Sequence, residues 1–196
     1  RGVRVYYFPY DVADAEIPEH RIDYKYDVAF FGSHLHQGHR IDWLEEINKS
    51  YPIKVFSWNW QDWKDRGFNA EPAVYGDVFN NRVAECKINL GFSVEPNCWG
   101  YWSNRTGKTL LAGGFLLYEY APGMESTFGD AIVYFSSPQE AVEKIGYYLS
   151  HDDERGRIRY RGSELGKAKF SSKVRVKELM ILIDRMKKGD YRKWNL

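Results

Sequence analysis

The chain has 196 residues, 43% of them hydrophobic and 28% charged, so it is neither disordered nor fibrous and can bury the core of one ordinary domain. No apolar run reaches the roughly 20 residues of a membrane span, and no charged-then-apolar leader opens the sequence. Its two cysteines, Cys86 and Cys98, lack the CxxC spacing of a thiolate zinc site. We therefore expect no disulfide framework and no membrane span, and the simplest expectation is a protein of the reducing cytoplasm.

The formal charge of +1 conceals an uneven distribution. Residues 155–196 hold 14 Lys and Arg against 4 Asp and Glu, a net +10, whereas residues 1–154 hold 14 against 23, a net −9. Such a basic end is typical of chains that meet phosphate, whether in nucleic acid, anionic lipid or a nucleotide. The same pattern arises when charged residues form the solvated face of helices on an acidic body. Charge alone leaves both interpretations open.

From residue 27 onward, short apolar runs alternate with segments of helical periodicity, and residues 3–8 also have a strand-like composition. The clearest helix start is Ser137, followed by Pro138 at the first helical position and by Glu140, which completes a capping box. Strands are expected at 27–33, 53–58, 87–92, 115–119 and 131–135, and helices at about 41–50, 77–86, 104–112, from 138 onward, and 152–188.

Strands that alternate with helices indicate βαβ units, which build a parallel sheet with helices on both faces. The sequence therefore predicts an α/β fold, a Rossmann-like parallel sheet flanked by helices. We expect an N-terminal strand and linker segment at 1–23, the Rossmann-like domain at 24–170, and a basic C-terminal helix and tail at 171–196. Ligands of such sheets bind beyond the carboxyl ends of the strands, so candidate site residues follow each strand.

Gly107-Lys108-Thr109 matches only the end of a P-loop, because Trp102 stands at the first glycine position, and ATP or GTP hydrolysis is not favoured. Arg105 and Lys108 instead share one face of the expected helix, and two cations on a first turn are unfavourable unless an anion is present. They suggest a diphosphate, because cations there would neutralise a phosphate leaving group. The alternative is an exposed pair of charges without a function.

Gly32 and Ser33 end the first predicted strand, and Arg40 lies near the start of the next helix. The histidines between them, at 34, 36 and 39, have no carboxylate or thiolate at a spacing that suits a metal, so we predict no metal site. Gly32 would allow close approach of the backbone, and Arg40 would supply a fork of hydrogen-bond donors. The segment therefore predicts an anion pocket, with a polar surface loop as the alternative.

Two carboxylates, Glu119 and Glu125, follow the strand expected at 115–119. A carboxylate beside a nucleotide site commonly accepts hydrogen bonds from ribose hydroxyls. Paired acid–base chemistry is also conceivable, but the spacing does not fix the separation that a glycosidase requires. No nucleophile elbow and no serine or cysteine triad is visible in the sequence.

Residues 104–155, NRTGKTLLAGGFLLYEYAPGMESTFGDAIVYFSSPQEAVEKIGYYLSHDDER, resemble the C-terminal half of the CgeB/YkvP type of spore-protein glycosyltransferases, which are related to the group 1 glycosyltransferases. YDVAFFGS at 26–33 with Arg40, and FSWNW at 56–60, similarly resemble the first strand of that family and its strand ending in tryptophan. The resemblance covers about residues 24–175 and rests on the order and spacing of the motifs.

The resemblance implies a GT-B enzyme with two Rossmann-like domains, of which this chain would be the half that binds a nucleoside-diphosphate sugar. An N-terminal acceptor domain would lie outside it. By the same resemblance, Gly32 and Ser33 would line the phosphates, Arg105 would contact the diphosphate, Glu125 would lie near the sugar or ribose, and Trp60 would border the base pocket.

One position departs from the family pattern. Lys108 stands where related enzymes place a ribose-binding Glu, and a lysine cannot accept hydrogen bonds from hydroxyls. Either Lys108 serves the phosphate, or the ribose contact has moved to Glu119 or Glu125.

The sequence thus predicts a metal-independent glycosyltransferase domain that needs no cofactor and moves a sugar from a nucleoside diphosphate to an unknown acceptor. Arg105 and Lys108 would act in catalysis by stabilising the departing diphosphate. Two alternatives stay open: a nucleotide- or carbohydrate-binding module without turnover, and a nucleic-acid-binding domain that uses the basic C-terminal helices. The expected donor-binding residues are Gly32, Ser33, Arg40, Trp60, Arg105, Lys108, Glu119 and Glu125.

Overall fold

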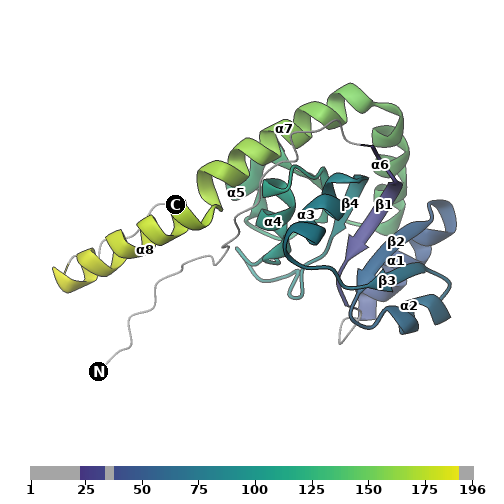
Figure 1. Ribbon diagram of the computed structural model, residues 1–196, viewed down its shortest axis with the longest axis horizontal. Coiled ribbons are helices and arrows are strands. Elements are labelled where there is room, and N and C mark those ends of the chain that lie inside the picture. Colours follow the sequence, from purple (N-terminus) through teal and green to yellow (C-terminus); the bar gives the residue numbers. More distant parts are fainter. Residues whose placement is uncertain (1–22, 34–37, 190–196) are drawn as a thin grey trace.

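The computed structural model describes residues 23–33 and 38–189, and every structural statement below concerns these residues. The strand expected at 3–8 lies outside them. Six strands form one sheet in the order β3-β2-β1-β4-β5-β6, and every neighbouring pair is parallel (Figure 1). The strands are β1 (Tyr26–Phe31), β2 (Ile53–Ser57), β3 (Asn69–Pro72), β4 (Cys86–Gly91), β5 (Leu116–Glu119) and β6 (Val133–Phe135). The predicted Rossmann-like parallel sheet is therefore confirmed.

Helices connect the strands and cover both faces of the sheet (Figure 1). They are α1 (Gly38–Ser50), α2 (Trp60–Asp65), α3 (Gly76–Ala84), α4 (Arg105–Leu111), α5 (Met124–Phe128), the 3-10 turn η1 (Gly129–Ala131), α6 (Pro138–Ser150), α7 (Asp152–Lys169) and α8 (Ser172–Lys187). The sequence did not predict α2, α5 or β3.

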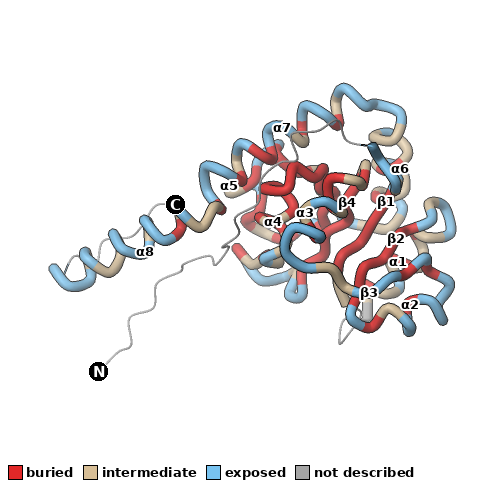
Figure 2. Tube along the Cα trace, in the orientation of Figure 1, coloured by how far each residue is buried: buried red, intermediate tan, exposed pale blue. Residues whose placement is uncertain are grey.

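Alternation along the strands places apolar side chains on both faces of the sheet. In β1, Val28 and Phe30 pack in a cluster with residues of α1 and α6, whereas Ala29 and Phe31 pack with residues of α3 on the other face. Figure 2 shows that burial is concentrated in these central strands and the adjoining helices. A sheet buried on both faces leaves its carboxyl edge as the place for a ligand.

The predicted capping box begins α6. The Ser137 hydroxyl accepts a hydrogen bond from the backbone N–H of Glu140 at 3.1 Å, which satisfies one free donor of the first turn. The Glu140 carboxylate accepts in return from the N–H of Ser136 at 2.7 Å, one residue before the expected Ser137. The local sequence thus fixes where this helix starts.

The helical stretch expected at 152–188 is divided into α7 and α8 at Phe170 and Ser171. Phe170 is buried and its ring stacks on Phe128 with centroids 5.4 Å apart, so the break is held by the core. Beyond it α8 extends away from the sheet and is largely exposed (Figures 1 and 2). None of the described helices is long and apolar enough to cross a membrane.

Candidate functional site

A cavity of about 530 Å³ opens at the carboxyl edge of the sheet, where β1, β2 and β3 end and α3 and α4 begin. This volume lies within the roughly 300–1,000 Å³ that is usual for small-molecule sites. Glycine, serine, amide and charged groups line it together with aromatic side chains. The lining residues are Phe31, Gly32, Ser33, Phe56, Ser57, Trp58, Ala73, Val74, Tyr75, Gly76, Asp77, Phe79, Asn80, Asn104, Arg105 and Lys108.

The turn after β1 contributes Gly32 and Ser33 to the cavity wall. A Cβ atom at position 32 would lie 2.6 Å from the Phe30 ring, so a larger residue would require the ring or the turn to move. The absence of a side chain at position 32 thus makes room for the Phe30 ring, and the Gly32 N–H donates to the carbonyl of Phe56 at 3.1 Å.

Two cations, Arg105 and Lys108, face the same cavity from the first turn of α4. Both are half-buried, and no carboxylate of the described chain forms an ion pair with either of them. Burial lowers the pKa of Arg105, while Tyr118 and Tyr101 act in the opposite direction. A bound anion would offset the cost of holding these charges away from water.

Aromatic side chains form another part of the wall. Trp58 is 60% exposed and Tyr75 is 75% exposed, although both line the cavity. Behind them Phe31 stacks on Phe56 with centroids 4.8 Å apart and meets Phe79 edge-on at 5.1 Å. Large exposed rings beside a cavity provide a surface on which a planar ring of a ligand can stack.

Arg40 does not line the cavity, although the sequence predicted it in an anion pocket. Its guanidinium is buried outside the cavity lining and donates to the carbonyl of Ser33 at 3.2 Å and to that of Ser93 at 3.1 Å. Burial, and then the charge of Arg105, lower the pKa of Arg40 to about 10. The guanidinium of Arg40 thus joins the turn after β1 to the turn after β4. It stabilises the cavity wall at Ser33 without lining the cavity itself.

The two predicted carboxylates also lie outside the cavity lining. Glu119, the last residue of β5, is buried, and its Oε1 lies 2.8 Å from Nε2 of His39. Glu125 is exposed on α5, where it interacts with Tyr120. Neither carboxylate therefore lines the cavity, in contrast to the expected donor-binding residues Arg105 and Lys108.

Trp60 begins α2 and packs against the core, with Lys64 Nζ 4.6 Å from its ring centroid, whereas Trp58 lines the cavity two residues earlier. No cluster of metal-binding side chains occurs among residues 23–33 and 38–189. His34 and His36 lie outside the described residues.

Three cavity residues that the sequence did not predict, Tyr75, Asp77 and Asn80, follow β3. The rule that ligands meet the residues after each strand would have found them, but β3 itself was not predicted. Its sequence, NAEP, has only one buried residue, Ala70, and gives no alternation of apolar side chains.

A six-stranded parallel sheet in this order is the architecture of the C-terminal Rossmann-like domain of GT-B glycosyltransferases. Residues 39–181 match the glycosyl transferase-like family, and the chain belongs to that family. A comparison with curated protein sequences finds no match.

Solved glycosyltransferases share the fold at low sequence identity. Sucrose-phosphate synthase of Thermosynechococcus elongatus is 7% identical with a TM-score of 0.68, over 84% of this chain and 46% of that one. Anabaena HepE, solved with UDP and glucose, is 14% identical with a TM-score of 0.61, over 82% and 48%. An alpha1,3-fucosyltransferase with GDP is 16% identical with a TM-score of 0.55, over 69% and 38%. This chain spans less than half the length of each.

Proposed function

We propose that this chain is the donor-binding part of a glycosyltransferase that moves a sugar from a nucleoside diphosphate to an acceptor. The observation that carries the proposal is the cavity in which Arg105 and Lys108 stand without a carboxylate partner among the described residues, beside the turn at Gly32 and Ser33. A diphosphate has the negative charge that two half-buried cations without a carboxylate partner require.

The nucleoside would lie toward β2 and β3, with its base against Trp58 and Tyr75. This placement replaces Trp60 as the aromatic border of the base. Asp77, Asn80 and Asn104 are cavity residues with a carboxylate or amide oxygen that can accept hydrogen bonds from ribose hydroxyls, a role that Lys108 cannot fill. Glu119 and Glu125 are not needed for it.

In the reaction, the bond between the anomeric carbon and the phosphate oxygen breaks, and the oxygen keeps the electron pair. Arg105 and Lys108 would stabilise the negative charge that develops on the diphosphate, which is the electrostatic work that a metal ion performs in other enzymes. The acceptor hydroxyl attacks the anomeric carbon, and its proton passes to a base that we place outside this chain. The domain therefore works by positioning and by charge.

The motif order also leads us to propose the CgeB/YkvP type as the particular relative, with residues 24–170 as the donor domain and 171–196 as a basic C-terminal extension. An acceptor domain outside this chain is consistent with its coverage of less than half of the solved glycosyltransferases. A cytoplasmic location fits the two cysteines, which are both free thiols.

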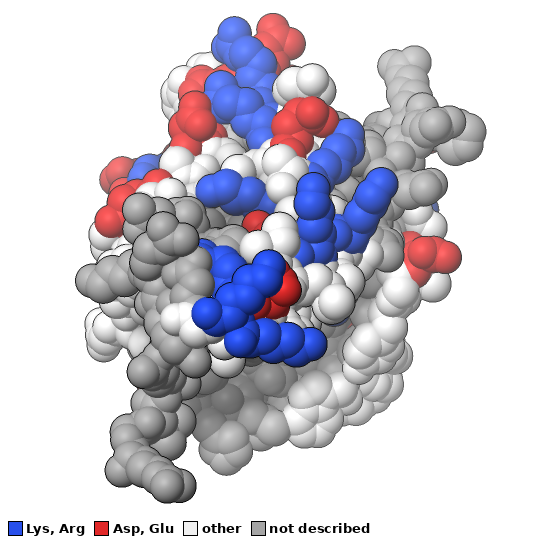
Figure 3. Space-filling view, turned by 90° about the vertical axis from the view of Figure 1, so that its left-hand side faces the viewer, with Lys and Arg blue, Asp and Glu red and all other residues white. Residues whose placement is uncertain are grey.

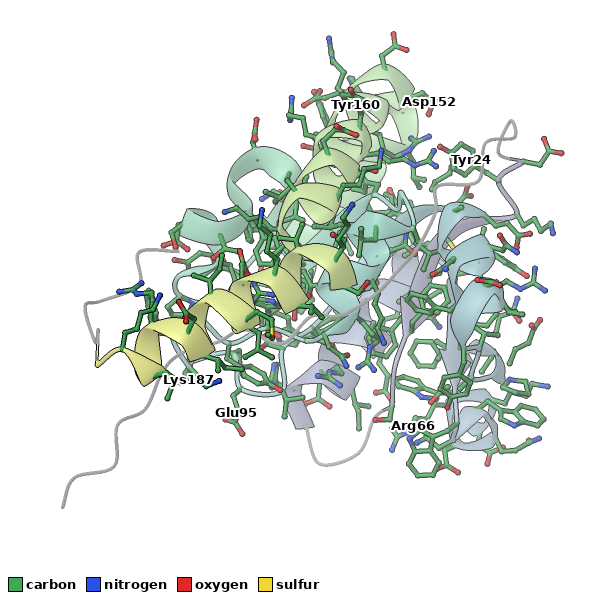
Figure 4. The ribbon with its side chains drawn as sticks, turned by 60° about the vertical axis from the view of Figure 1, so that its left-hand side comes forward. Tyr24, Arg66, Glu95, Asp152, Tyr160 and Lys187 are labelled. Carbon is green, nitrogen blue, oxygen red and sulfur yellow. The ribbon has the colours of Figure 1, made fainter. Side chains whose placement is uncertain are left out.

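The basic helices do not outweigh the cavity as evidence for the function. Lys167 and Arg175 form ion pairs within α7 and α8, at 2.9 and 2.6 Å, and Lys188 pairs with Asp184 at 2.7 Å. Lys173 and Lys177 are exposed and form no ion pair with another described residue. On the face seen in Figure 3 several basic side chains lie together, with acidic ones mainly around them, and Figure 4 shows that α8 follows α7 from Asp152 to Lys187. Exposed charges are screened by salt and contribute little by themselves, so they favour nucleic-acid binding less than the cavity favours a diphosphate.

A thermal-shift panel of nucleoside diphosphates, with and without EDTA, tests the proposal. A ligand that binds only the folded state stabilises it by about 2.7 kcal/mol at 100 times its Kd. At least one of UDP, GDP, ADP and CDP should raise the melting temperature, equally with EDTA, while neither a single-stranded nor a duplex oligonucleotide should. Absence of a shift with every diphosphate would contradict the proposal. Where a diphosphate does raise the melting temperature, an assay for hydrolysis of the corresponding sugar nucleotide distinguishes an enzyme from a binding module.

A further inference from the structure

The first turn of α4 carries both cations of the cavity, but its N-cap side chain does not cap it. Asn104 occupies the N-cap position and is a residue type that commonly caps helices, yet its side chain makes no capping hydrogen bond and lines the cavity. The free backbone N–H groups of this turn therefore need other acceptors. The groups that supply those acceptors also determine where the turn places Arg105.

Ser103, one residue before Asn104, supplies two of these acceptors. Its hydroxyl oxygen accepts a hydrogen bond from the backbone N–H of Arg105 at 3.3 Å. Its carbonyl oxygen accepts a hydrogen bond from the backbone N–H of Thr106 at 2.9 Å. Ser103 thus takes the place of the N-cap side chain, and the position of Arg105 depends on the position of Ser103.

Tyr118, in β5, binds Ser103 from the core of the protein. The Tyr118 hydroxyl accepts a hydrogen bond from the backbone N–H of Ser103 at 3.0 Å. Tyr118 is 1% exposed, and its ring lies against Gly91, its register partner in β4, where a Cβ atom would come within 2.1 Å of the ring. A ring enclosed this closely has little freedom to move, so its hydroxyl is a fixed acceptor for Ser103.

The other end of α4 is held by close packing on α7. A Cβ atom at Gly162 of α7 would lie 2.9 Å from the Leu110 side chain, and one at Gly166 would lie 3.1 Å from the backbone nitrogen of Leu111. These contacts do not involve the Tyr118 hydroxyl. Removing that hydroxyl should therefore release the first turn of α4 and leave the rest of the helix in place.

We propose that Tyr118 is a positioning residue of the donor site, whose hydroxyl holds Ser103 and thereby keeps Arg105 where it contacts a bound diphosphate. Tyr118 does not line the cavity, so it acts through the hydrogen bonds that join its hydroxyl to Ser103 and Ser103 to Arg105. This inference rests on the proposed function, because it requires a diphosphate at Arg105. Contacts of this kind are sensitive to displacements of about 1 Å.

Calorimetry on Tyr118→Phe measures the effect, with UDP or GDP as the ligand, whichever raises the melting temperature of the wild type more. The substitution removes one hydroxyl and keeps the ring. Affinity should fall about 2- to 10-fold, which corresponds to one neutral hydrogen bond. Ser103→Ala, which removes the acceptor for the Arg105 N–H, should act in the same direction. Tyr134→Phe is the matched control and should keep wild-type affinity, since Tyr134 is the register partner of Tyr118 in β6 and its buried hydroxyl has no hydrogen-bond partner among the described residues.

A double-mutant cycle with Arg105→Ala separates positioning from a general structural role. If Tyr118 acts through Arg105, Tyr118→Phe should cause no further loss of affinity in the protein that already carries Arg105→Ala. The same cycle with Ser103→Ala applies this test where Tyr118→Phe does not fold. Wild-type affinity in the single variant, or an equal loss in both backgrounds, would overturn this inference and leave the donor site standing. No binding of any nucleoside diphosphate to the wild type would overturn both this inference and the proposed function.

Discussion

Basic side chains occur in two regions of this molecule with different surroundings. In the cavity, Arg105 and Lys108 are half-buried and have no carboxylate partner among residues 23–33 and 38–189. Along α7 and α8, cations are more numerous and mostly exposed, and several form ion pairs such as Lys167 with Glu164. The density of positive charge in the sequence is therefore highest where the side chains are solvated, and not where two cations line a cavity.

The difference shows which property of a charge indicates binding. An exposed ion pair contributes about 0–1 kcal/mol and is screened by salt, so it costs little and needs no ligand. A half-buried cation without a partner has lost part of its hydration and is stabilised only when an anion arrives. Removing cations from the two regions should separate these cases.

The largest expected effect comes from the cavity. Arg105→Ala should weaken binding of the preferred nucleoside diphosphate about 10- to 100-fold, because a hydrogen bond to a charged group contributes about 1.5–3 kcal/mol. Lys108→Ala should act in the same direction. Calorimetry measures both, and Arg66→Ala is the matched control, since Arg66 at the end of α2 forms an ion pair with Glu45 and is exposed (Figure 4). If all three variants bound the nucleoside diphosphate with equal affinity, Arg105 and Lys108 would not contact the diphosphate.

An intermediate effect is expected from the aromatic wall. Trp58→Ala and Tyr75→Ala should each weaken nucleoside-diphosphate binding about 2- to 10-fold, because aromatic stacking contributes about 0.5–1.5 kcal/mol. Both rings are exposed, so the melting temperature without ligand should change little. Tyr160→Ala, at an equally exposed ring on α7, provides the control (Figure 4). Retained affinity for the nucleotide in both variants would place the base elsewhere.

The smallest effect is expected from the cations of α7 and α8. Replacing Lys167, Lys177 and Lys187 together by Gln should leave nucleotide affinity within about twofold and the free energy of unfolding within about 0.5 kcal/mol per site. Denaturant unfolding and calorimetry measure the two quantities. A loss of nucleotide affinity as large as that of Arg105→Ala would show that these charges belong to the donor site. It would contradict the claim that the cavity cations alone bind the diphosphate.

The sequence predicted the sheet better than the site because periodicity reports burial. Four of the six strands, β1, β2, β4 and β5, are largely buried, and their neighbouring helices carry apolar stripes or a cap such as Ser137. The edge strand β3 lacks that signal, so its neighbours Tyr75 and Asp77 were missed. The resemblance to a family pointed to Trp60 for the base pocket, whereas Trp58, two residues earlier, lines the cavity.

Side-chain direction limited the prediction of charged residues in the same way. Arg105 and Lys108 share a helix face, which their spacing already indicated, and both line the cavity. Arg40 and Glu119 also follow strands or open helices at the carboxyl edge, yet their side chains point into the protein and bond to Ser33, Ser93 and His39. Position along the chain places a residue at the edge, whereas tertiary packing decides which way it faces.

The most direct measurement is a crystal structure of this chain soaked with UDP-glucose or with GDP, whichever stabilises it more. The account predicts diphosphate oxygens within hydrogen-bond distance of Arg105 and Lys108, beside the turn at Gly32, and a base ring against Trp58 or Tyr75. Density for the nucleotide at any other surface, with solvent alone between the two cations, would contradict it.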